Sequence, residues 1–176
     1  MDFKMVNSFC WPIDDIVEIL ASGEEPVSME SLTCVSSYKV CDFRKTGEGF
    51  LKTIEWSVRG QIPSFAKKVI HPDKLKFNEE TSWNNDAATF TTKVTPHFLK
   101  DKIKCMIVVQ WGHDGEGKSR RTVDCNVKVR VPFIGNKLER MIAEILKENN
   151  EKYANLLNTS FANHLGQPGD YQKTEG

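Results

Sequence analysis

The sequence of 176 residues lacks long apolar runs, and neither sign of charge is in excess. No stretch approaches the roughly 20 consecutive apolar residues that a membrane-spanning helix needs. The 24 basic and 24 acidic residues give a formal net charge of zero, so we expect no nucleic acid among its partners. Residues 1–5 lack the apolar core of a secretory signal peptide, which favours a cytoplasmic protein.

Motifs of common cofactors and catalytic sites are also missing. The sequence has no P-loop, dinucleotide fingerprint, serine nucleophile elbow or zinc-protease helix. Its five cysteines and four histidines show no metal-ligand spacing, and the glycine-rich residues 112–117 fit a hairpin turn better than a calcium or phosphate loop. Lys118, Arg120 and Arg121 form a small basic patch that is typical of a solvated strand end. We therefore expect no cofactor and no metal, and we assign no catalytic residue.

The strongest periodic pattern that is present lies in residues 136–164. Its apolar residues recur at i, i+3, i+4 and i+7, which predicts a helix about 43 Å long with one apolar stripe. Pro132 ends the preceding strand, Gly135 permits a turn, and Asn136 and Glu139 are spaced as a capping pair. A helix of this length needs a broad surface to pack against.

The rest of the chain supplies that surface as strands. Apolar and polar residues alternate in seven segments bounded by turn residues, which predicts seven strands. They are residues 3–11, 32–43, 50–61, 75–83, 88–94, 103–111 and 122–131. Pro12 and Gly23 bound a short amphipathic helix after the first strand, and residues 27–31 permit one more helical turn.

This order predicts an α+β fold in a single domain, residues 1–165, followed by a disordered tail, residues 166–176. The short turns favour an antiparallel sheet of seven strands, wrapped around the C-terminal helix. Seven strands span about 30 Å, whereas one helix is about 10–12 Å wide, so the sheet must curve around it. Either large side chains fill the groove, or a cavity remains that holds a ligand.

Large apolar side chains and two polar ones are candidates for the wall of such a cavity. They are Trp56, Phe77, Glu79, Phe90, Met106, Trp111, Leu138, Met141, Ile145, Asn149 and Tyr153. Glu79 and Asn149 interrupt apolar faces, so each would contact the polar part of a ligand or be a satisfied buried group. The apolar members fit a packed core equally well.

Two further segments place apolar residues beside lysines, at Phe65 and Ile70 and at Phe98 and Leu99. Such segments could form the entrance of a cavity and touch a membrane transiently. Alternatively, Phe65 and Ile70 close one end of the core.

Two stretches carry a resemblance to a known family. They are residues 62–68, Ile-Pro-Ser-Phe-Ala-Lys-Lys, and residues 127–139, Val-Lys-Val-Arg-Val-Pro-Phe-Ile-Gly-Asn-Lys-Leu-Glu. The chain resembles the START-like (Bet v 1-like, helix-grip) superfamily and is most similar to a poorly characterised START-like family known mainly from actinobacteria. This resemblance spans residues 55–162. Glu55-Trp56 and Pro63-Ser64 are also similar to PRELI-like phospholipid-transfer domains.

The resemblance implies that a hydrophobic ligand is enclosed between the curved sheet and the C-terminal helix. We therefore expect the protein to carry, store or transfer a hydrophobic small molecule such as a lipid, sterol, isoprenoid or pigment. Two alternatives stay open. One is a small-molecule enzyme of the cyclase or hydrolase type, with Glu79, Tyr153 or a histidine as its candidate groups. The other is an interaction module whose core is filled.

Overall fold

The computed structural model describes residues 1–29, 32, 35–59, 62, 64–67, 70 and 75–168. The elements in these residues are β1 (Asp2–Phe9), α1 (Ile13–Ala21), β2 (Val35–Thr46), β3 (Gly49–Val58), β4 (Lys76–Asn84), β5 (Thr89–Pro96), β6 (Ile103–His113), β7 (Ser119–Val129) and α2 (Gly135–Leu165). The predicted features at 27–31, 32–43, 50–61, 62–68 and 166–176 each lie partly outside the described residues.

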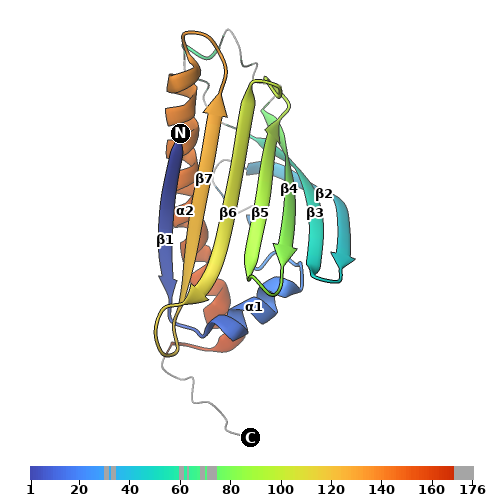
Figure 1. Ribbon diagram of the computed structural model, residues 1–176, viewed down its shortest axis with the longest axis vertical. Coiled ribbons are helices and arrows are strands. Elements are labelled where there is room, and N and C mark those ends of the chain that lie inside the picture. The colour runs from blue at the N-terminus through green and yellow to red at the C-terminus, as the bar shows by residue number, and fades with distance from the viewer. Residues whose placement is uncertain are drawn as a thin grey trace, which may run out of the picture.

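The seven strands of this described part form one antiparallel sheet in the order β1-β7-β6-β5-β4-β3-β2. Strands β2 to β7 pair with their neighbours in sequence, and β1 pairs with β7 at the far edge. Figure 1 shows α2 running along the β1 and β7 side of the curved sheet, while α1 crosses one end of it. The predicted α+β helix-grip fold, with a short helix after the first strand, is therefore confirmed.

The short helix α1 forms where the sequence predicts it. Pro12 immediately precedes its first residue, a position that suits the fixed φ of proline. Ile13, Ile16 and Leu20 are buried, as expected for one apolar stripe. Gly23 follows the helix with φ +79°, a conformation that favours glycine. The chain thereby turns at Gly23 toward the space under α2.

Helix α2 begins one residue earlier than predicted and lacks the predicted capping pair. No side-chain hydrogen bond caps its first turn. Glu139 instead accepts a hydrogen bond from the Val129 N–H at 2.8 Å and pairs with the N-terminal ammonium at 3.3 Å. A Cβ on Gly135 would lie 2.6 Å from the Val129 carbonyl oxygen, so the helix starts in direct contact with the end of β7. This close approach places Glu139 over the strand rather than over its own helix end.

Buried apolar residues form two clusters along α2. In the first cluster, at the end of α2, the rings of Phe9, Trp11, Trp111 and Phe161 meet at centroid distances from 5.1 to 6.1 Å. The second cluster lies at the start of α2 and contains Ala66, Ile70, Ile103, Cys105, Val127, Val129 and Leu138. Helix α2 is thus fixed to the sheet at both ends. Within the residues described, neither helix combines the length and apolarity that crossing a membrane requires.

Two glycines of the β2–β3 turn, Gly47 and Gly49, are expected to differ strongly in how much their replacement by alanine lowers stability. Gly49 has φ +155°, and a Cβ there would lie 2.0 Å from the Trp83 carbonyl oxygen, whereas a Cβ on Gly47 would meet nothing within 4 Å. We expect Gly49→Ala to destabilise the protein by about 2 kcal/mol or more, because the backbone must shift or strain. Gly47→Ala should change stability by less than about 0.5 kcal/mol. Urea unfolding followed by circular dichroism measures both, and equal midpoints would contradict this account.

Candidate functional site

A cavity of about 270 Å³ lies between the sheet and the middle of α2. Residues 23–26 and Met29, which follow α1, form a further wall and are called the 23–29 segment here. Much of the floor is apolar and comes from five strands. The apolar floor residues are Met5, Phe50, Ile54, Phe90, Ile107, Val109 and Val123. The cavity is therefore bounded by the sheet, by α2 and by the 23–29 segment, and it is partly open to solvent.

A row of polar side chains crosses this floor on three neighbouring strands. Lys52 on β3 pairs in register with Thr81 on β4, which pairs with Thr92 on β5. The two threonine hydroxyls lie 2.9 Å apart and share a hydrogen bond. The same register row continues through Ile107 on β6 and Cys125 on β7. At this level the floor is polar toward β3 and apolar toward β7.

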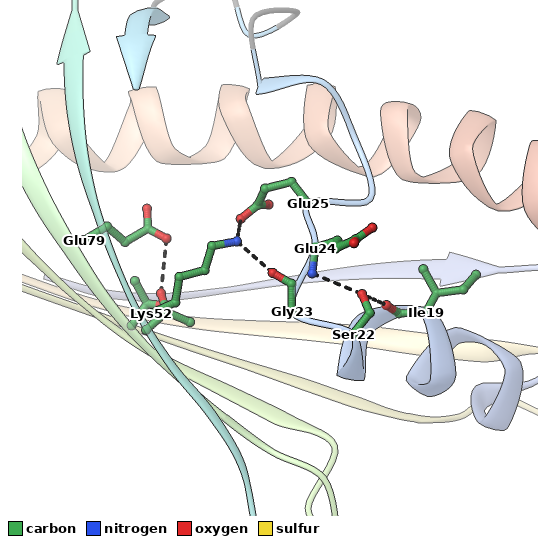
Figure 2. Close-up of polar contacts among 9 residues, drawn as sticks. Ile19, Ser22, Gly23, Glu24, Glu25, Lys52 and Glu79 are labelled. Carbon is green, nitrogen blue, oxygen red and sulfur yellow. Dashed lines mark hydrogen bonds and ion pairs between the residues drawn. The ribbon is translucent and has the colours of Figure 1, made fainter. Parts of the chain in front are cut away.

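Lys52 joins the floor to the 23–29 segment. Its side chain is 8% exposed, and its ammonium donates to the Gly23 carbonyl oxygen at 3.0 Å and to Glu25 Oε1 at 2.5 Å. Figure 2 shows the ammonium directed away from its strand toward both groups. A cation this buried needs such a partner because its desolvation costs on the order of several kcal/mol. The ion pair therefore holds the segment against the sheet over the cavity.

Glu79 on β4 lies beside Lys52 and lines the cavity (Figure 2). Its Oε1 accepts a hydrogen bond from the Thr81 hydroxyl at 3.2 Å. Burial, and secondly the charge of Glu25, raise the pKa of Glu79 from 4.5 to about 7, against the effects of Thr81 and of the Lys52 charge. The Trp56 indole N–H also favours the ionised form, although it makes no hydrogen bond of acceptable geometry. Near neutral pH this carboxyl group can both give and accept a proton.

A second polar group lies at the β1 and β7 side of the cavity. Arg121 on β7 is 8% exposed, and its Nη1 donates to Asn7 Oδ1 at 3.2 Å and to Asn150 Oδ1 at 2.5 Å. Its guanidinium carbon lies 5.3 Å from the centre of the Tyr153 ring. Burial lowers the pKa of Arg121 and raises the pKa of Tyr153. Arginine stays charged in proteins, so a full positive charge lies in the cavity wall.

Two buried indole N–H groups in the wall, those of Trp56 and Trp111, have no hydrogen-bond partner among the described residues. The other two tryptophans, Trp11 and Trp83, each donate to a carbonyl oxygen, at 3.2 and 2.6 Å. Buried polar groups are normally paired, so these two N–H groups are exceptions among the described residues, and both nitrogen atoms are enclosed by protein. In the same described part of the chain, no group of three or more His, Cys, Asp or Glu side chains could hold a metal ion.

The structure brings together part of the predicted set of lining residues. Those in the cavity wall are Trp56, Glu79, Phe90, Trp111, Asn149 and Tyr153. Their contact with a ligand stays a prediction. Phe77 does not line the cavity; it is the register partner of Trp56 on the same face of the sheet, and the two rings stack with centroids 6.0 Å apart. Leu138 and Met141 pack in and against the second cluster, so the packed-core alternative describes them better.

The predicted orientation of Met106 and Ile145 is wrong, because their side chains are 36% and 42% exposed. The residues on either side of Met106 face inward, so the alternation of β6 places Met106 on the outer face. On α2 the cavity side passes through Leu146 and Asn149. Ile145 is one position from Leu146, a rotation of about 100° around the helix, which turns it to solvent.

The four predicted entrance residues, Phe65, Ile70, Phe98 and Leu99, belong to the second cluster or pack against it. Ile70 is 4% exposed, so the prediction that it forms an entrance or touches a membrane is wrong. Ile70 and Phe65 close that end of the core, and Lys137 Nζ lies 5.9 Å from the Phe65 ring centre. Contact of the other three with a membrane stays a prediction.

Sequence analysis missed both buried cations of the cavity. Lys52 stands between Phe50 and Ile54 in the inward-facing series of β3. The interpretation of Arg121 as a solvated strand end is wrong, since it stands two residues before Val123 in the inward-facing series of β7. The period-two alternation that predicts the strands therefore also predicts that Lys52 and Arg121 face inward. A lysine or arginine in such a series is a signal of buried, partnered charge.

The fold and its cavity define the class of the protein: it has the helix-grip fold of the START-like (Bet v 1-like) superfamily. It is similar to a START superfamily protein from Mycobacterium smegmatis, with a TM-score of 0.56 and 12% identity over 90% of this chain and 94% of that chain. It is also similar to the Zhui aromatase/cyclase from Streptomyces sp. R1128, with a TM-score of 0.66 and 7% identity over 93% and 95% of the two chains. For norcoclaurine synthase from Thalictrum flavum the TM-score is 0.65, with 11% identity over 95% and 89%. Identities this low show a common fold alone.

The chain belongs to the family described as Protein of unknown function (DUF2505), whose profile matches residues 5–159. The structural likeness confirms the START-like resemblance at the level of the fold. The family profile also covers residues before Glu55, where the resemblance in sequence ends. A comparison with curated proteins gave no match.

The raised pKa of Glu79 predicts how stability depends on pH. The folded protein holds this proton more tightly than the unfolded chain, so its stabilisation is complete below about pH 4.5 and is lost as pH rises through about 7. The change is at most on the order of 3 kcal/mol, because solvent in the cavity screens it. We expect Glu79→Gln, which cannot ionise, to become more stable relative to the wild type as pH rises.

Urea unfolding at about pH 5 and about pH 8 measures this difference. Glu80→Gln is the matched control, because Glu80 is the next residue of β4 and pairs with Lys93 at 2.9 Å on the exposed face. The difference in the free energy of unfolding between Glu80→Gln and the wild type should be the same at both pH values. A pH-independent difference for Glu79→Gln as well would contradict the burial of that carboxyl group.

Proposed function

We propose that the protein binds one small hydrophobic molecule in the cavity under α2 and carries, stores or transfers it. The observation that supports this proposal is the cavity itself, because packed interiors seldom retain a void of about 270 Å³. Apolar ligand surface buried against its floor would contribute about 25 cal/mol per Å². Norcoclaurine synthase, which shares the fold, has been solved in complex with the aromatic molecules dopamine and hydroxybenzaldehyde.

The volume of the cavity favours a compact ligand. Pockets that enclose drug-sized molecules measure about 300–1,000 Å³, so about 270 Å³ lies just below this range. A molecule of one or two rings, or a short isoprenoid, suits this space better than a phospholipid with two acyl chains. Of the ligand classes that the sequence suggests, the smaller isoprenoids are therefore preferred, and the aromatic ligands of norcoclaurine synthase add small aromatic molecules as a further class.

Polar groups at two sides of the wall would orient such a ligand. Glu79 and Thr81 face the cavity on the β4 side, and Arg121 faces it on the β7 side. A few convergent polar groups in an apolar wall are the usual means by which a pocket fixes a ligand's direction.

One observation favours a second candidate function, catalysis on the bound molecule. Glu79 lines the cavity with a pKa of about 7, which suits a general acid or base. Two structures of the same fold are, by their names, an aromatase/cyclase and a synthase. Mass spectrometry of ligands extracted from wild type and Glu79→Gln distinguishes the functions. A binding protein yields the same molecule from both, whereas an enzyme yields a different one from the variant.

A neutral fluorescent probe, N-phenyl-1-naphthylamine, tests the proposed binding. We expect saturable binding of one probe per protein, with a Kd on the order of micromolar. Ile107→Trp should weaken binding by at least about tenfold, because the larger side chain extends from the floor into the cavity. A fluorescence titration measures both affinities.

Val108→Trp is the matched control, because Val108 is the next residue of β6 and is 36% exposed on the outer face. Circular dichroism and thermal unfolding establish that both variants are folded. Full binding by folded Ile107→Trp, or no binding by the wild type, would overturn the proposal.

A further inference from the structure

The two buried cations of the cavity differ in how their charge is balanced. Lys52 pairs with Glu25 at 2.5 Å. Arg121 makes no ion pair within the described residues, and its hydrogen-bond partners are the neutral side chains of Asn7 and Asn150. A buried charge without an opposite charge is unfavourable unless something else compensates it. The β7 side of the cavity therefore has an excess of positive charge.

Nearby acidic side chains do not supply the missing negative charge. Asp124 and Asp114 form ion pairs with other cations, at 3.3 and 3.6 Å. Glu79 faces a part of the cavity distant from Arg121. The residues in register with it on the neighbouring strands lead across the sheet to Val127 on β7. Val127 is six positions along β7 from Arg121 (121 to 127), a distance of about 20 Å in a strand. Glu25, whose charge acts on the Tyr153 hydroxyl beside Arg121, is already paired with Lys52. The groups of the described residues that act electrostatically on Arg121 itself are Tyr153 and Cys125, and neither is a carboxylate. The guanidinium is thus left for a group that does not belong to these residues.

The guanidinium also has a free donor edge. Its Nη1 makes both hydrogen bonds, which leaves Nε and Nη2 without an acceptor in the described part of the chain. These two nitrogens form one edge of the planar group, which matches the two oxygens of a carboxylate. Neither nitrogen is fully enclosed by protein atoms, and Arg121 lines the cavity, so this edge of the guanidinium is accessible to a ligand.

Trp111 lies beside Arg121, because it is the register partner of Arg121 on β6, and it lines the same cavity. Its indole N–H has no hydrogen-bond partner among the described residues, but the nitrogen is fully enclosed by protein. Trp111 therefore offers a ligand its ring surface, and the accessible donors at this place are those of the Arg121 guanidinium.

We propose that Arg121 binds a carboxylate of the ligand, which makes the ligand a small hydrophobic acid. This inference rests on the proposed function, since it names the ligand class of the same cavity. The carboxylate lies against the Nε and Nη2 edge, while Asn7 and Asn150 hold the guanidinium at Nη1. The apolar body of the ligand then extends over Ile107 and Val109 on the floor.

A matched pair of ligands tests this assignment by isothermal titration calorimetry. The pair is 1-naphthaleneacetic acid and its neutral amide, 1-naphthaleneacetamide, which share their rings and differ in charge. We expect the wild type to bind the acid at least about tenfold more tightly than the amide. Arg121→Met should weaken binding of the acid by about 10- to 100-fold and change binding of the amide by less than about threefold.

Two further variants separate charge from position. Arg120→Met is the matched control, because Arg120 immediately precedes Arg121 on β7 and its side chain is exposed, and this variant should leave both affinities unchanged. Arg121→Lys keeps the charge without the planar edge, so its affinity for the acid should be intermediate. If Arg121→Met does not fold, thermal unfolding of the wild type in the presence of acid or amide tests the assignment instead. The acid should then raise Tm more than the same concentration of amide.

The outcomes distinguish this inference from the proposed function. The assignment would be overturned if the wild type bound acid and amide with equal affinity, or did not bind the acid. It would also be overturned if Arg121→Met weakened the binding of acid and amide by the same factor. The proposed function would then still stand if N-phenyl-1-naphthylamine binds. Failure of the wild type to bind that neutral probe would overturn the proposed function itself.

Discussion

The difference in width between a seven-stranded sheet and a single helix governs this structure. A sheet about 30 Å wide cannot be covered by a helix about 10–12 Å wide, so the sheet curves around α2. The first and second clusters fill the groove at the two ends of the helix. The middle of the groove is covered by the 23–29 segment and stays hollow. The cavity follows from the architecture, and its chemistry depends on the few side chains that face it.

Two cations in that cavity illustrate two ways of burying a charge. Both side chains are 8% exposed. Lys52 is balanced by Glu25 within the chain, and the pair fixes the 23–29 segment. Arg121 is supported by amides from β1 and α2, which are nearly the whole sequence apart. Neutral amides orient a guanidinium without balancing its charge. The positive charge on the β7 side of the cavity is therefore uncompensated within the described residues, whereas the positive charge on the β3 side is balanced by Glu25.

Local periodicity explains how much of this could be predicted. Alternation and the helical stripe predict the elements to within a few residues, because both patterns are properties of neighbouring residues. The orientation of Met106 follows from the alternation of β6, because Met106 lies an odd number of positions from the inward-facing Trp111, but apolar residues on both faces from Ile103 to Val109 obscure this pattern. Ile145 and Leu146 are both apolar, so the pattern does not decide which of them faces the sheet. The 23–29 segment has no periodicity, and its position depends on Lys52, a contact distant in sequence.

The tryptophans give this protein an optical property of its own. Of its four tryptophans, Trp56 and Trp111 line the cavity, and their N–H groups have no hydrogen-bond partner among the described residues, whereas Trp11 and Trp83 donate hydrogen bonds within the protein. Indole emission depends on the polarity around the ring and on whether its N–H is bonded. A ligand in the cavity would therefore change the environment of two of the four indoles and leave that of the other two unchanged. The intrinsic fluorescence of the protein would then report occupancy without a label, with an internal reference in the same spectrum.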